Sequence, residues 1–133
     1  MKKYLIMFMI MALSGIASIA VLAGAADAFS IERLVIAGSI DEREPVGVVD
    51  TYSASTKKIY CFLEAGDISA DTTVSFVWYF GETEMGSVEL SLREGSRWRT
   101  WSSKTLYGNA GDWKVELQDE NGAVLETVTF TVE

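Results

Sequence analysis

The stretch TVSFVWYF (residues 73–80) decides the fold class. Every second side chain is large and apolar, which places Val74, Phe76, Trp78 and Phe80 on one face of an extended chain. A period of two residues is that of a β-strand, because successive side chains point to opposite faces. The stretch therefore predicts a strand that buries one face in a core.

Similar short runs lie on both sides of this stretch, and no apolar stripe of helical period and length follows residue 28. These runs cover residues 31–36, 46–52, 58–64, 85–92, 97–103, 113–118 and 124–132. Asn121-Gly122 joins the last two, and both residues tolerate the positive φ that a hairpin turn needs. About eight strands at this spacing predict a single antiparallel β-sandwich with immunoglobulin-like topology. The Cys…Trp…Cys framework of antibody domains is absent, because Cys61 is the only cysteine.

Length and composition exclude several classes of protein. The 133 residues suffice for one domain, and 49% hydrophobic residues with one proline exclude a disordered or collagen-like chain. There is no histidine, so the usual general base and the commonest metal ligand are missing. The net charge of −8 disfavours nucleic-acid binding, which needs a basic surface.

The first 28 residues are typical of an export signal. Lys2 and Lys3 precede an apolar region, and Ala26-Asp27-Ala28 fits the small-x-small pattern of signal peptidase sites. We expect cleavage before Phe29 and a periplasmic or extracellular protein. Retention as a membrane anchor is the alternative, since the apolar region is long enough to span a bilayer.

Residues 29–133 are predicted to form the sandwich domain. After removal of Lys2, Lys3 and Asp27 it carries nine basic and eighteen acidic residues. Five of those nine basic residues, but only two acidic ones, fall between residues 93 and 114. A locally basic region within an acidic domain is a candidate site for an anionic group.

The strand at residues 97–104 places Arg97, Arg99 and Trp101 on one face, and we call these three residues the basic strip. A guanidinium beside an indole can bind a carboxylate or phosphate, or stack on a sugar. The competing interpretation is a set of internal ion pairs, to Glu89, Glu116 or another neighbour. The binding candidates are Arg97, Arg99, Trp101, Lys104 and Tyr107. The aromatic residues expected in the structural core are Trp78, Trp98, Trp113 and Phe130.

Other candidate sites are weaker. The carboxylates Asp41, Glu42 and Glu44, or Asp67 and Asp71, lack the spacing of a calcium loop, so we interpret both sets as solvated loops. Cys61 lies within a predicted strand, and we interpret it as a small buried side chain. A nucleophilic role would need a histidine or a comparable base, and the chain has no histidine. We therefore expect no catalytic residue, no metal site and no cofactor.

Several segments together resemble a known family. They are Glu42-Arg43-Glu44-Pro45-Val46, Val74 to Tyr79, Arg97 to Lys104, Gly111 to Val115, Asn121 to Leu125, and Phe130. In this order they resemble the bacterial family called domain of unknown function 2914, and the resemblance covers nearly all of residues 31–132. The family pattern has a His-Arg pair where this chain has Phe76 and Val77, so a polar site built on that pair would be incomplete here. The resemblance implies export and a sandwich fold, and no activity.

The sequence therefore predicts an exported, non-enzymatic β-sandwich that binds another envelope protein or takes part in a cell-surface assembly. The alternative is a module that binds a glycan or small anion through the basic strip. An enzyme is a third class, disfavoured because the ordinary acid–base and nucleophile sets are missing. An unpaired edge on the strand Val124–Val132 would favour protein binding by strand addition. We expect membrane contact only through an uncleaved N-terminal segment.

Overall fold

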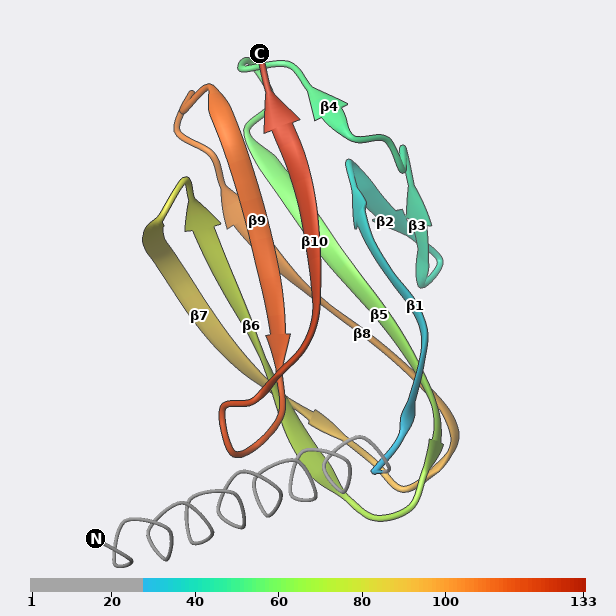
Figure 1. The fold of residues 1–133 in the computed structure, drawn as a ribbon. Coiled ribbons are helices and arrows are strands. Elements are labelled where there is room, and N and C mark those ends of the chain that lie inside the picture. The colour runs from blue at the N-terminus through green and yellow to red at the C-terminus, as the bar shows by residue number, and fades with distance from the viewer. Residues whose placement is uncertain (1–27) are drawn as a thin grey trace, which may run out of the picture.

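The computed structural model describes residues 28–133, which contain ten strands and no helix (Figure 1). The predicted signal segment therefore lies outside the described residues, apart from Ala28. None of residues 28–133 forms a helix that could cross a membrane. The strands are β1 (Ser30–Ala37), β2 (Ser39–Asp41), β3 (Glu44–Val46), β4 (Thr51–Tyr52), β5 (Lys58–Ile68), β6 (Thr72–Phe80), β7 (Thr83–Leu92), β8 (Gly95–Thr105), β9 (Gly111–Gln118) and β10 (Val124–Val132).

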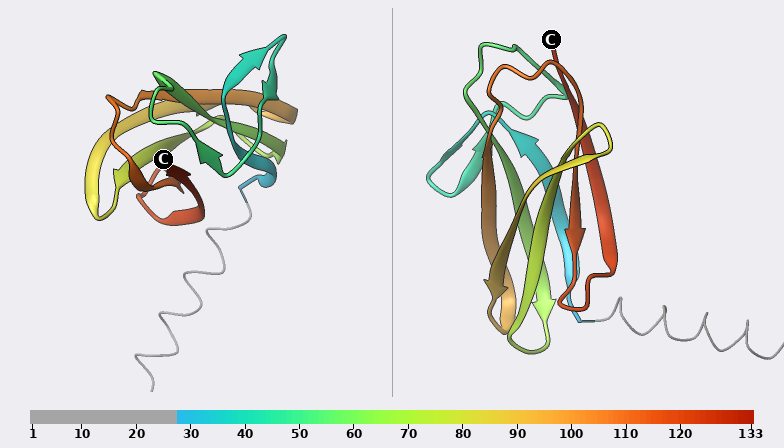
Figure 2. Two further views of the ribbon diagram at one scale, coloured as in Figure 1. Left: turned by 90° about the horizontal axis from the view of Figure 1, so that it is seen from above. Right: turned by 90° about the vertical axis from the view of Figure 1, so that its left-hand side faces the viewer.

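Two sheets pack face to face, and the immunoglobulin-like sandwich predicted from the sequence is confirmed. One sheet has the strand order β1-β5-β8, and the other has the order β4-β10-β9-β6-β7. The views in Figure 2 show these two layers and a small projecting hairpin, β2–β3. The structure has ten strands where about eight were expected.

The core lies between the sheets and consists of the apolar residues that face inward from the strands of both sheets. Trp78 of β6 and Trp113 of β9 are each 1% exposed. Phe130 of β10 stacks on Trp113, with 5.9 Å between the ring centroids, and meets Trp78 edge-on at 6.3 Å. The strand pattern of residues 73–80 is thus explained by an aromatic cluster that the second sheet covers.

The segment 46–52, predicted as one strand, is instead divided. Val46 ends β3, Gly47 takes a positive φ of 71°, and the chain becomes extended again only at β4. A left-handed residue turns the chain and interrupts pairing, so Val48 and Val49 remain half-exposed in the connection. The short β4 then pairs parallel to the end of β10, an exception to the expected antiparallel order.

The charged residues 41–45, predicted as a connection, form the turn of the β2–β3 hairpin. Asp41 pairs with Glu44, and the two turn residues Glu42 and Arg43 have φ values of 50° and 65°. Positive φ at both central positions is the pattern of a type I′ turn, which usually contains asparagine and glycine. The hairpin projects from the sandwich (Figure 2), and Glu44 connects it to Arg99 on the outer face of the β1-β5-β8 sheet.

Candidate functional site

The basic strip lies on the outer face of the β1-β5-β8 sheet. Arg99 is directly opposite Glu64 of β5, and Trp101 is opposite Phe62. These side chains share one face because alternate residues of paired strands do so. The structure therefore brings Arg97, Arg99 and Trp101 together in the way that the alternation predicted.

The arginines of this face pair with two glutamates. Glu64 binds Arg33 of β1 at 2.8 Å and Arg97 at 3.0 Å, measured between nitrogen and oxygen. Glu44 of the hairpin binds Arg33 at 3.1 Å and Arg99 at 2.9 Å. The competing interpretation, internal ion pairs, is thus the observed arrangement for Arg97 and Arg99, with Glu64 and Glu44 as the partners.

The contacts between Arg33 and Glu44 favour the charged form of both groups. Hydrogen bonds from Arg33 lower the pKa of Glu44 below its ordinary value, and Glu44 and Glu64 raise the pKa of Arg33 in return. The side chain of Glu64 is only 10% exposed and lies between Arg33 and Arg97. Glu44 therefore fastens the hairpin to the sheet.

Aromatic contacts continue the network. The rings of Phe62 and Trp101 are stacked, with centroids 6.2 Å apart. The guanidinium of Arg33 lies 5.0 Å from the centre of the Phe62 ring, and that of Arg43 lies 6.0 Å from the centre of Trp101. Both distances are within the range of cation–π attraction. Trp101 is therefore half-buried between a ring and a cation.

Two of the predicted binding residues lie away from the basic strip. The amino group of Lys104 donates a hydrogen bond of 2.7 Å to the carbonyl of Met85 and so joins β8 to β7. Tyr107 is 78% exposed in the loop after β8 and has a positive φ of 54°. Neither side chain belongs to the network around Glu64 and Glu44, so the structure does not assemble the five candidates into one site.

Among the expected core residues, Trp98 is a partial exception. It pairs with Ala65 on the inward face of β8 and packs against the core, but it is only partly buried. β8 is the last strand of its sheet, so one side of this indole remains open. Cys61 is fully buried, and burial raises the pKa of its thiol.

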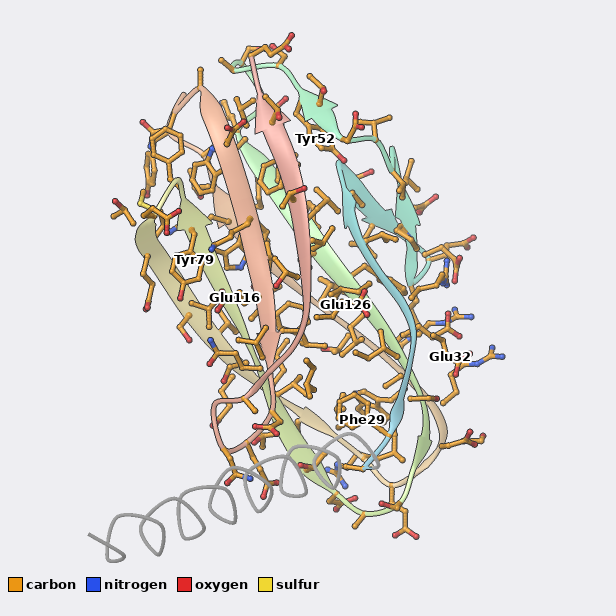
Figure 3. The ribbon with its side chains drawn as sticks, viewed as in Figure 1. Phe29, Glu32, Tyr52, Tyr79, Glu116 and Glu126 are labelled. Atoms are coloured by element: carbon orange, nitrogen blue, oxygen red, sulfur yellow. The ribbon has the colours of Figure 1, made fainter. Side chains whose placement is uncertain are left out.

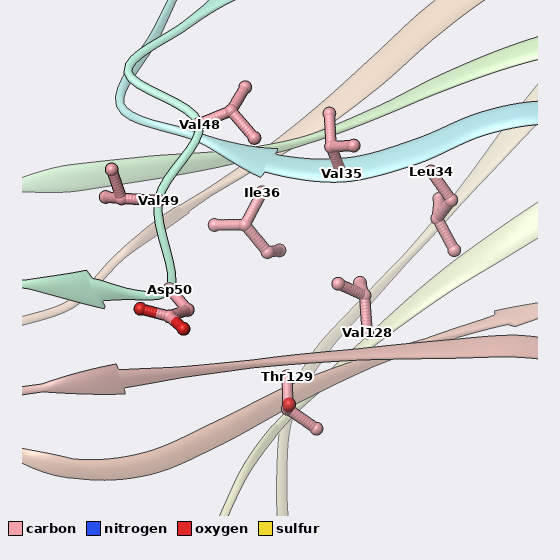
Figure 4. Close-up of a pocket in the computed structure, with 8 residues that line it drawn as sticks. All are labelled: Leu34, Val35, Ile36, Val48, Val49, Asp50, Val128 and Thr129. Carbon is pink, nitrogen blue, oxygen red and sulfur yellow. The ribbon is translucent and has the colours of Figure 1, made fainter.

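A second candidate surface lies at the side of the sandwich where β1 and β10 are neighbours. A pocket of about 440 Å³ opens between them, and Ile36 and Val128 point toward each other across it (Figure 4). Its lining is Leu34, Val35, Ile36, Val48, Val49, Asp50, Val128 and Thr129. We call this pocket the lateral groove.

Both strands that border the lateral groove have unpaired backbone on one side. Among residues 28–133, β1 pairs with β5 alone, and β10 pairs with β9 along its length but with β4 only at Thr131 and Val132. Glu126 projects from β10 toward the side where β1 lies (Figure 3). Asp50 lines the groove. The groove is thus lined mainly by apolar side chains, with Asp50 as its one charged residue, and Glu126 lies near it on β10.

The sequence indicated only parts of these two surfaces. Glu64 follows a run of apolar residues in which a charge is unexpected, and that oddity was the available signal for a buried ion pair. The hairpin that carries Arg43 and Glu44 was interpreted as a loop. The groove depends on how far β4 extends along β10, which no local pattern specifies. Among residues 28–133, no three Cys, Asp or Glu side chains converge as metal ligands would.

Comparisons with known proteins identify a family and a fold. Residues 71–132 match the family described as "Protein of unknown function (DUF2914)". No curated protein matches the chain. An immunoglobulin-like protein from Pseudomonas aeruginosa superimposes with a TM-score of 0.53 at 12% identity, over 82% of this chain and 99% of that one. At this identity the likeness shows the fold alone.

A β-glucosidase from Listeria innocua also resembles the sandwich. The TM-score is 0.49 at 8% identity, over 78% of this chain. This chain matches only 15% of the length of the glucosidase, so the resemblance concerns one part of a much larger enzyme.

Proposed function

Residues 71–132 match the DUF2914 family, and because that family's name states no activity, we propose a function from the surface of the domain itself. The protein is an exported, non-enzymatic binding module that takes up an extended segment of another envelope protein. The segment adds to the open edge of β10 and places its apolar side chains in the lateral groove.

The observation that carries this proposal is the free backbone of β10 beside an apolar pocket. The N–H of Thr131 donates to the carbonyl of Asp50 at 2.9 Å, so it points away from β9. Backbone groups two residues apart in a strand point the same way, so those of Thr127 and Thr129 also face away from β9. Within residues 28–133 no strand pairs with β10 on that side before Thr131.

The edge of β10 has few of the features that normally prevent strand addition. Edges are usually blunted by lysine, proline or an inward charge. Residues 124–132 read VLETVTFTV, which contains neither lysine nor proline and one charged residue, Glu126. Val48 and Val49, which are about half-exposed, extend the apolar surface beside this edge. The combination fits recognition by strand addition, in which backbone hydrogen bonds give affinity and side-chain pockets give specificity.

The charges around the lateral groove indicate the chemistry of the partner. Asp50 lines the groove and Glu126 projects from β10 near it, so a segment with apolar side chains and flanking basic ones is complementary. The same acidic groups disfavour pairing between two copies of this chain. A basic, extended segment of a different protein is therefore the proposed partner.

Export is the part of the proposal that rests on the sequence. The order of Lys2-Lys3, a long apolar region and Ala26-Asp27-Ala28 supports it. The absence of histidine supports a binding role over acid–base catalysis. In the basic strip, Arg97 already forms an ion pair with Glu64, and Arg99 forms one with Glu44.

The test is Thr129→Pro with Thr129→Val as its matched control. Proline removes the outward N–H of residue 129, and because this N–H does not pair with β9, the sandwich should remain intact. Valine keeps the N–H and the β-branched shape. The tagged full chain should capture its partner from solubilised envelope as wild type and as T129V, but not as T129P.

Capture alone would not locate the site, so a second measurement is needed. Amide hydrogen exchange should slow at Thr127 and Thr129 when the captured partner, or a peptide from it, is added. Equal capture by T129P, or protection elsewhere on the domain with none on β10, would contradict strand addition.

A further inference from the structure

A second pocket lies on another part of the molecule, at the open edge of β8. Its volume is about 310 Å³, and it is bounded by the β2–β3 turn, β7 and β8. Its lining consists of Arg43, Leu90, Ser91, Trp98, Arg99, Thr100 and Trp101. No carboxylate is among these residues, although the whole chain has a net charge of −8. We call it the indole pocket.

The two arginines of the indole pocket differ in their contacts. Arg99 uses Nη1 to bind Glu44, and its Nε is buried without a hydrogen-bond partner in the described part of the chain. Arg43 makes no ion pair within residues 28–133, and its guanidinium lies over Trp101. The Arg43 guanidinium, which lines the pocket without an ion pair among residues 28–133, is therefore available to an anionic ligand.

The position of Arg43 is maintained at the expense of backbone strain. Glu42 and Arg43 both have positive φ, which asparagine and glycine adopt more easily than long side chains do. Strain of this kind concentrates at functional sites, where the surrounding structure holds it in place. Here the turn places Arg43 on Trp101, and the adjacent Glu44 anchors the hairpin to Arg33 and Arg99. A glycine at position 43 would relieve the strain and lose the cation.

We propose that the indole pocket binds a carboxylated sugar ring, that is, a uronic acid unit. Its carboxylate would lie between Arg43 and Arg99, because guanidinium groups bind carboxylates through paired hydrogen bonds. Trp101 on the outer face of β8 and the open side of Trp98 on its inward face line the pocket and provide apolar surface for the ring. The hydroxyls of Ser91 and Thr100 can bond to the hydroxyls of the sugar. A largely apolar pocket with a few placed polar groups is the usual form of a small-molecule site.

Three ligands test the roles of the carboxylate and of the sugar ring separately. Sodium glucuronate, glucose and sodium acetate are titrated into the full chain and followed by calorimetry and tryptophan fluorescence. Glucuronate should bind with a Kd on the order of 1 mM, as expected for a ligand of this size. Glucose lacks the carboxylate and acetate lacks the ring, so each should bind at least tenfold more weakly.

Two glycine substitutions in the same turn provide a matched pair. Arg43→Gly removes the cation, relieves the strain at position 43, and should weaken glucuronate binding at least tenfold while the melting temperature stays the same or rises. Glu42→Gly relieves the neighbouring position and leaves the pocket lining intact, so it should bind glucuronate as the wild type does. Loss of binding in R43G therefore cannot be attributed to unfolding.

Three results would overturn the proposal. The first is no saturable signal with glucuronate at concentrations tenfold above the expected Kd. The second is equal binding by R43G and wild type. The third is binding of acetate, or of an acidic tripeptide, as tight as that of glucuronate, which would assign the pocket to carboxylates in general or to proteins. Since Thr129 lies on β10 and Arg43 in the β2–β3 turn, failure here leaves strand addition untouched.

Discussion

Trp78 donates its indole N–H to the hydroxyl of Ser102 at 3.0 Å, and this bond joins the two sheets through the middle of the core. Trp78 belongs to β6 and Ser102 to β8, so the residues come from opposite layers. Both side chains are buried, at 1% and 4% exposure. Ser102 is therefore the acceptor that allows a tryptophan to be fully buried here.

Replacing Ser102 by alanine should destabilise the domain by about 1–3 kcal/mol, because the indole N–H would be left unsatisfied inside the core. The measurement is urea unfolding followed by circular dichroism. Ser103→Ala is the matched control, since Ser103 is the next residue, exposed on the opposite face, and should change stability by less than about 0.5 kcal/mol. In the S102A background, Trp78→Phe should cost less than it does in the wild type.

The two tryptophans Trp113 and Trp98 should differ in their contribution to stability. Trp113 is 1% exposed, stacks on Phe130 and donates to the carbonyl of Asn109 at 3.0 Å. Its replacement by alanine should cost about 3–5 kcal/mol. Trp98 is only partly buried, so Trp98→Ala should cost clearly less. Equal losses of unfolding free energy for the two variants would contradict the burial described here.

The ion pair of Glu44 should make stability depend on pH in acid. Hydrogen bonding to Arg33 lowers the pKa of Glu44 in the folded state below its ordinary value of 4.5. The unfolded chain therefore takes up this proton first, and the stabilisation is full above pH 4.5 and lost as the pH falls through the lowered pKa. Glu44→Gln should be less stable than the wild type near pH 7, and the difference should shrink in acid.

The control for this experiment is Glu42→Gln, which removes one negative charge from the same turn without breaking an ion pair within residues 28–133. Urea midpoints measured from pH 3 to pH 7 give the comparison. A constant difference between E44Q and the wild type over this range would show that Glu44 contributes through something other than its charge.

The sequence specified the layers of the fold better than their edges. The alternation of residues 73–80 depends on burial of one strand face, so it correctly predicted the strand and its inward tryptophan. Residues 46–52 have the same apolar character, yet Gly47 turns the chain and leaves Val48 and Val49 outside the core. Composition alone cannot distinguish a valine that is buried in the core from one that is exposed beside a strand edge, because both occur in extended segments.

The candidate sites were less predictable for a related reason. Alternation correctly grouped Arg97, Arg99 and Trp101, since that depends on one strand only. Their partners lie far away in the sequence. Glu64 of β5 precedes Arg97 by 33 residues, and Glu44 of the β2–β3 hairpin precedes Arg99 by 55, so only tertiary packing brings each pair together. Arg43 reaches Trp101 through two turn residues with positive φ, a conformation that Glu-Arg does not suggest.

Cleavage before Phe29 should leave the domain folded. Ala28 precedes β1, and its carbonyl accepts hydrogen bonds of 3.2 Å from both the N–H and the hydroxyl of Ser69. Cleavage before Phe29 would remove this acceptor. Ser69 is exposed, so water can replace the lost bonds and the cost should be below about 1 kcal/mol. Phe29 packs against the core and stays with the domain.

Cleavage is therefore compatible with the fold, and the native protein should have the mass of residues 29–133. Intact-mass spectrometry of protein purified from its own envelope fraction measures this directly. Ser69→Ala should leave the melting temperature of the cleaved form unchanged, because in that form the serine has no Ala28 carbonyl to bind. A native mass that includes Met1 would instead establish the N-terminal segment as a retained anchor, and recovery of the protein from the cytosol would refute export.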